Sequence, residues 1–106
     1  MASTPEGKVK KRISAILKQY EKDERLLYWM PVPTGYGTRQ VDYIGVHLGR
    51  FFCIEAKRPG GRVTNLQEDF MRRVERAGGK SFVIDEDSDF ATSDLREWLS
   101  GKGAIR

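Results

Sequence analysis

The sequence predicts a single α/β domain, residues 1–106, in which a mixed β-sheet is flanked by helices. Its 106 residues are the length of one domain. Stretches with a helical spacing of apolar residues alternate with short apolar runs that are typical of strands. Glycine and proline clusters separate these stretches, and the resulting order is α-β-β-β-α-β-α.

The first helix is expected to begin after Thr4, which can cap it, with Pro5 in its first turn. Its apolar residues recur on one stripe, namely Val9, Ile13, Ile16, Leu17 and Tyr20. Residues 26–30 form a short apolar run that predicts a strand. Residues 31–40 contain two prolines and two glycines, which predict a loop.

Two further strands, 41–48 and 50–57, are expected to form a β-hairpin, because they flank a turn near Gly49. A second helix is expected from Thr64, and the glycine pair at 78–79 ends it. The apolar stripe of this helix consists of Leu66, Phe70, Val74 and Ala77.

The end of the chain predicts one more strand and one more helix. Residues 81–84 form a short apolar strand, and residues 85–89 form an acidic turn. A closing helix is expected from the spacing of the apolar residues Phe90, Leu95, Trp98 and Leu99.

Composition and charge exclude several classes of protein. One cysteine excludes an internal disulfide framework, and one histidine excludes a multi-histidine metal site. No apolar run approaches the ~18 residues of a membrane span, so we expect no membrane partner and a cytoplasmic location. Residues 1–62 carry twelve Lys/Arg against six Asp/Glu, whereas residues 63–106 carry seven against nine. A basic half indicates a polyanionic partner, most simply nucleic acid, or else a solvated basic face.

The residues that can carry chemistry lie at the open end of the hairpin. Glu55 and Lys57 follow an apolar run and share one face of their strand, because side chains alternate along a strand. Folding the hairpin at Gly49 brings Asp42 close to Glu55. Two neighbouring carboxylates suit Mg²⁺, and a lysine beside them completes the parts for metal-assisted phosphodiester hydrolysis. The alternative is an ion pair on a strand face with no catalytic role.

Two other residues invite a functional interpretation. His47 lies near the hairpin turn, where we expect it to be exposed and without a role in the site. Cys53 is expected to be a small core residue, because no second cysteine and no adjacent base accompanies it as a nucleophile would require.

Asp42 followed by Glu55-Ala56-Lys57 resembles the Asp…(Asp/Glu)-x-Lys signature of restriction-endonuclease-like nucleases, and of their VRR-NUC branch in particular. The likeness covers about residues 6–84. It includes a glutamate at the start of the first helix, glycines around the Asp42 strand and a Gly-rich loop that leads into a Gln-bearing helix. It implies a restriction-endonuclease-like core.

The resemblance also implies a role for each residue of the motif. The metal ligands would be Asp42, Glu55, the main-chain carbonyl of Ala56 and, approaching from the first helix, Glu6. Lys57 would be the catalytic lysine, and Gln67 would orient Lys57 or a water molecule. Gln67 fits equally well as the third residue of a capping box with Thr64, and we expect one amide not to meet both roles.

The function implied by the resemblance is a Mg²⁺-dependent deoxyribonuclease, in which Mn²⁺ can substitute. Arginines in loops beside the site suit DNA phosphates. The expected DNA contacts are Tyr36, Arg39, Arg58, Arg62 and Lys11. Small stand-alone members of the family, typical of phage and bacterial genomes, resemble Holliday-junction resolvases that act on branched DNA as homodimers, and the length of this chain favours that group.

Three alternatives stay open: a DNA-binding module without activity, a flap or single-strand nuclease module, and a protein-binding module. The third would use apolar and aromatic residues, namely Tyr28, Trp29, Phe51 and Phe90. DNA cleavage that depends on Mg²⁺ separates the nucleases from the two binding modules.

Overall fold

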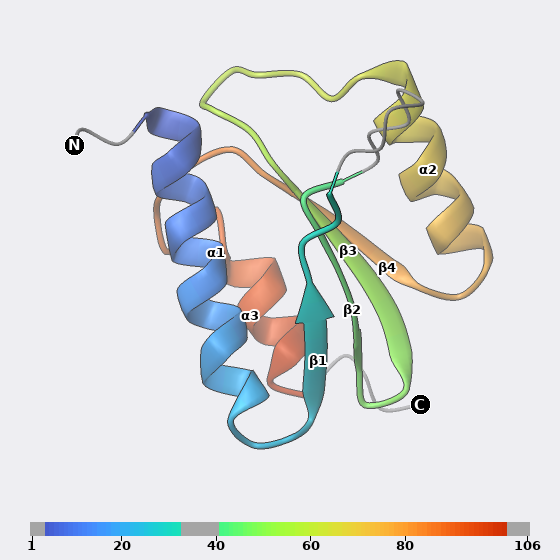
Figure 1. Ribbon diagram of the computed structural model, residues 1–106. Coiled ribbons are helices and arrows are strands. Elements are labelled where there is room, and N and C mark those ends of the chain that lie inside the picture. Colours follow the sequence, from blue (N-terminus) through green and yellow to red (C-terminus); the bar gives the residue numbers. More distant parts are fainter. Residues whose placement is uncertain (1–3, 33–40, 102–106) are drawn as a thin grey trace.

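The computed structural model describes residues 4–32 and 41–101, and its elements follow the predicted order (Figure 1). They are α1 (Pro5–Glu21), β1 (Leu26–Trp29), β2 (Tyr43–His47), β3 (Arg50–Ala56), α2 (Asn65–Arg76), β4 (Lys80–Ile84) and α3 (Ser93–Leu99). The predicted α/β class and layout are therefore confirmed. No helix within the described ranges combines the length and the apolar character needed to cross a membrane.

The four strands form one mixed sheet in the order β1-β2-β3-β4. The pairs β1–β2 and β2–β3 are antiparallel, and β3–β4 is parallel. The hairpin between β2 and β3 turns through Leu48 and Gly49, whose φ angles are both positive, 50° and 85°. A two-residue turn with positive φ at both positions matches the twist of the strands that it joins, so it fixes their register.

Helices cover both faces of this sheet, with α1 and α3 on one face and α2 on the other (Figure 1). The core beneath α1 and α3 consists of Val9, Ile13, Ile16, Leu17, Leu26, Tyr43, Phe52, Ile54, Ala56, Phe82, Ile84, Leu95, Trp98 and Leu99. The smaller core beneath α2 consists of Val41, Cys53, Met71 and Val74. Because side chains alternate along β3, Glu55 lies on the same face as Cys53, toward α2.

The expected core role of Cys53 agrees with the structure. The residue is fully buried, and burial raises the pKa of its thiol to about 12. A thiol with so high a pKa stays protonated near neutral pH and is a poor nucleophile.

The prediction that His47 is exposed is wrong. The side chain is fully buried, with its ring centroid 5.1 Å from that of Trp98 and 6.4 Å from that of Tyr20. His47 is the last residue of β2 and faces α1 and α3, so Trp98 of α3 covers it although it adjoins the turn. Burial lowers the pKa of His47, while the backbone of Leu99 acts in the opposite direction.

Candidate functional site

Pairing of β2 with β3 places Asp42 against the end of β3. The Asp42 N–H donates to the Ile54 carbonyl over 3.1 Å, which continues the register of Tyr43 opposite Ile54. Asp42 Oδ2 accepts a hydrogen bond of 2.9 Å from the Ala56 N–H. The Asp42 side chain is buried and bound to the backbone of the residue that follows Glu55. The two carboxylates that the sequence singles out thus meet at one end of the sheet.

Glu55 is 2% exposed, and its two carboxylate oxygens have different surroundings. Oε2 accepts a hydrogen bond of 2.8 Å from Gln67 Nε2 and lies 3.2 Å from Lys57 Nζ. Oε1 is buried and has no hydrogen-bond partner among the described residues. A buried charged acceptor without a partner is unusual and costly, so this oxygen is suited to bind a ligand.

The electrostatics of Glu55 also favour an added cation. Burial raises the pKa of Glu55, and the neighbouring charge of Asp42 raises it further. Lys57 and Gln67 oppose this shift through hydrogen bonds to the carboxylate and, for Lys57, through its charge. A cation near both carboxylates would favour their ionised forms.

Gln67 completes the capping box and contacts Glu55 at the same time, whereas the sequence led us to expect one amide to serve either the cap or the site. Gln67 Oε1 accepts a hydrogen bond of 2.9 Å from the Thr64 N–H, and the backbone N–H of Gln67 donates to Thr64 Oγ1 over 3.1 Å. Its Nε2 donates to Glu55 at the same time. An amide has its acceptor and its donors on different atoms, so one side chain completes the capping box and binds the carboxylate.

Lys10 of α1, which is not part of the sequence motif, also lies beside the site. Its Nζ lies 3.5 Å from Asp42 Oδ1 and 3.7 Å from Glu6 Oε2. The Tyr43 hydroxyl donates to the Lys10 carbonyl over 2.9 Å and so ties this turn of α1 to β2. The i,i+4 spacing of Glu6 and Lys10 is a signal that could have indicated their pairing on a helix, whereas no local signal indicates the contact of Lys10 with Asp42.

Among the contacts of the described residues, Glu6 is linked to the site through Lys10. Among the described residues, no group of three or more His, Cys, Asp and Glu is placed to hold a metal. Mg²⁺ commonly binds one or two protein carboxylates and keeps several waters. Asp42, Glu55 and the Ala56 carbonyl form a donor set of this kind. The feature that favours Mg²⁺ binding here is Glu55 Oε1, which has no partner among the described residues.

The expected DNA contacts are divided between described and undescribed parts of the chain. Arg58 and Arg62 are exposed in the loop that follows Lys57, and Lys11 is exposed on α1. This loop and the start of α1 lie at the same end of the molecule (Figure 1). Tyr36 and Arg39 lie outside the described residues.

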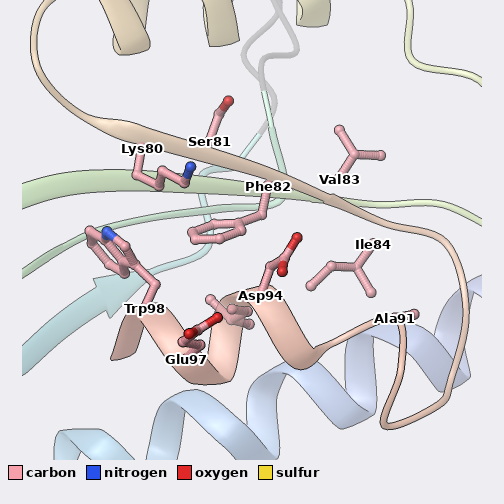
Figure 2. Close-up of a pocket in the computed structure, with 10 residues that line it drawn as sticks. Lys80, Ser81, Phe82, Val83, Ile84, Ala91, Asp94, Glu97 and Trp98 are labelled. Carbon is pink, nitrogen blue, oxygen red and sulfur yellow. The ribbon is translucent and has the colours of Figure 1, made fainter. Parts of the chain in front are cut away.

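A cavity of about 430 Å³ lies between β4 and α3 (Figure 2). It is lined by Lys80, Ser81, Phe82, Val83, Ile84, Ala91, Asp94, Leu95, Glu97 and Trp98. None of Asp42, Glu55 and Lys57 lines it. Part of its wall belongs to the core beneath α1 and α3, so it is separate from the carboxylate site.

Comparison with known protein families finds no family model that matches this chain, and comparison with curated proteins finds no match. The candidate site is therefore defined by the arrangement of Asp42, Glu55, Lys57 and Gln67 in the folded chain, together with the unpredicted Lys10.

Proposed function

We propose that the protein is a Mg²⁺-dependent endonuclease that hydrolyses phosphodiester bonds in DNA, with Mn²⁺ able to substitute. The observation that carries this proposal is the buried pair Asp42 and Glu55 beside Lys57, in which Glu55 Oε1 has no partner among the described residues. Asp42, Glu55 and the Ala56 carbonyl would hold the ion. When bound, the ion polarises a phosphate oxygen and makes a bound water more acidic.

The chain's own residues have distinct tasks in this proposal. The Lys57 ammonium is held at Glu55 and is largely buried, so it presents a positive charge that stabilises a reacting phosphate or orients the attacking water. Gln67 donates a hydrogen bond to Glu55 Oε2, so Oε1 is the oxygen left for a further ligand. Asp42 is fixed by the Ala56 N–H.

DNA is the proposed substrate because exposed basic side chains lie in the loop that follows Lys57 and on α1. Residues 1–62 carry twice as many basic as acidic residues, and the exposed Arg58, Arg62 and Lys11 belong to this half. Such side chains contact phosphates, which position a DNA backbone without reading its bases. We therefore extend the proposal to structure-selective cleavage of branched DNA, in the cytoplasm of a bacterial or phage-infected cell.

Paired cuts on two strands require two sites, and we propose that a second copy of the chain supplies the second one. An exposed apolar strip crosses three strands on the α2 face, since Leu27 pairs with Val46 and Val46 pairs with Phe51. Glu24 borders a hollow on the β1 side of this strip, and Arg73 borders another on the α2 side. A twofold axis can place such unlike charges opposite each other.

The dimer is tested by measuring the molar mass in solution. We expect wild type to be a dimer, and Val46→Glu, which puts a charge in the middle of the strip, to be a monomer with the same circular dichroism spectrum. A monomeric wild-type protein at high micromolar concentration would exclude the dimer and would leave the proposed chemistry intact.

The proposed activity is tested by incubating the protein with labelled four-way junction, flap, duplex and single-stranded DNA. We expect nicking of the junction with Mg²⁺ or Mn²⁺, no nicking with EDTA, and none by Asp42→Asn. Preferred cleavage of the flap or of single strands would favour the other nuclease class. Salt-sensitive binding without cleavage under any metal would indicate a DNA-binding module, and no binding at low salt would exclude both proposals.

A further inference from the structure

A lysine lies beside each carboxylate of the site. Lys57 Nζ lies 3.2 Å from Glu55 Oε2, and Lys10 Nζ lies 3.5 Å from Asp42 Oδ1. Both carboxylates are almost completely buried, with 3% and 4% of their side chains exposed. Two ammonium groups thus lie beside the two carboxylates, and a third carboxylate oxygen, Glu6 Oε2, lies 3.7 Å from Lys10 Nζ.

We propose that Lys10 is a built-in counter-ion of Asp42 in the metal-free protein, and that a divalent cation displaces it. This inference rests on the proposed function, because it requires Asp42 to be a metal ligand. A divalent ion bound between the two carboxylates would lie close to both ammonium groups. Like charges a few ångströms apart repel strongly where they are shielded from water, so one lysine has to withdraw.

The structure distinguishes the lysine that withdraws. The Lys57 side chain is 16% exposed, and it lies closer to its carboxylate. The Lys10 side chain is 31% exposed, lies farther from its carboxylate and already has a second acidic neighbour, Glu6 Oε2, at 3.7 Å. Lys10 can therefore leave Asp42 and keep an ion pair, which Lys57 cannot do with any neighbour that the described residues supply.

The movement needs no change in the backbone. The Lys10 carbonyl is held by the Tyr43 hydroxyl, so the turn of α1 stays in place while the flexible side chain turns toward Glu6. Asp42 keeps the hydrogen bond from the Ala56 N–H to Oδ2, and Lys10 competes with the ion for Oδ1, the oxygen that it faces. Glu6 then acts on the metal site indirectly, as the acceptor for the displaced ammonium.

The test measures Mn²⁺ binding to the full chain at low salt, by titration calorimetry or by the electron paramagnetic resonance of the free ion. We expect Lys10→Met to bind Mn²⁺ about two- to fivefold more tightly than wild type, the range expected when a partly exposed competing charge is removed. Lys10→Arg, which keeps the charge, should stay near wild type. Lys18→Met removes the same charge from an exposed position farther along α1 and should change the affinity by less than about twofold.

A second readout follows the melting temperature. Because a ligand stabilises the state that it binds, the increase in melting temperature caused by Mn²⁺ should be larger for Lys10→Met than for wild type. Lys10→Gln is the substitute if the methionine variant does not fold. Glu6→Gln should weaken Mn²⁺ binding, because the displaced ammonium loses its second partner.

The outcomes separate this inference from the proposed function. If wild type binds Mn²⁺ but neither Lys10→Met nor Lys10→Gln binds it more tightly, Lys10 is not the competitor, and the metal site stands. If wild type and both Lys10 variants fail to bind Mn²⁺ at millimolar concentration, the metal-dependent function and this inference are both wrong.

Discussion

The two faces of the sheet bury polar groups in different ways. On the face covered by α1 and α3, His47 and Trp98 have buried ring nitrogens without hydrogen-bond partners in the described part of the chain, and a large apolar core surrounds them. On the α2 face the core is small, and the buried Glu55 has Oε2 bound by Gln67 and Lys57 and Oε1 without a partner in the described part of the chain. Burial lowers the pKa of His47 on the first face and raises the pKa of Glu55 on the second, where Lys57 and Gln67 oppose the shift. The α1/α3 face is therefore suited to stabilise the fold, and the α2 face is suited to chemistry.

The largest expected effect is the loss of activity without a loss of stability when the carboxylates are neutralised. Asp42→Asn and Glu55→Gln each remove a ligand charge but little volume, so we expect cleavage to disappear while the protein stays folded. Cleavage of labelled junction DNA and the melting temperature check this together. Activity within tenfold of wild type in either variant would mean that the proposed site is wrong.

Removal of Lys57 is expected to slow cleavage by about 10²–10⁴-fold, the range for a positioned proton-transfer or charge-stabilising group. Mn²⁺ affinity should change much less than the rate, because an ammonium is not a metal ligand. The measurement compares the rate of Lys57→Met at saturating metal with that of wild type. A variant that loses metal binding but keeps its rate at saturating metal would contradict this role.

Gln67→Ala is expected to act on activity and on stability at once, because it removes the acceptor for Thr64 and the donor to Glu55. Thr64→Ala is the matched control, since it removes the cap hydroxyl and should cost about 1 kcal/mol of stability with activity retained. Chemical unfolding and cleavage rates of both variants check the prediction. If the two variants behave alike in both assays, the bond to Glu55 contributes nothing to the reaction.

The smallest expected effect lies on the opposite face and depends on pH. Burial lowers the pKa of His47 below the value near 6.5 that it has in the unfolded chain. The unfolded state therefore binds more protons, and the contribution of His47 to stability is present above pH 6.5 and is lost as the pH falls below it. We expect His47→Leu to flatten the decrease in melting temperature between pH 7.5 and pH 5.5. An unchanged pH profile in this variant would show that His47 does not titrate on unfolding.

Much of the candidate site was predictable because its elements depend on local interactions. Thr4 and Thr64 cap their helices through hydrogen bonds that span three residues. The Leu48-Gly49 turn fixes the register of the hairpin, and that register brings Asp42 opposite the end of β3. Such features follow from residue types a few positions apart, so the order of elements and the meeting of Asp42 with Glu55 could be inferred from the sequence.

The remaining features depend on how the helices dock, and docking is a property of the whole core. Lys10 reaches Asp42 because the apolar stripe of α1 packs on the sheet in one orientation. His47 is buried because α3 places Trp98 over the end of β2. Gln67 bridges its own cap and Glu55 because α2 begins directly beside β3. Each of these contacts joins residues from different elements, so the sequence alone determined the parts of the site, whereas tertiary packing decided which charges face each other.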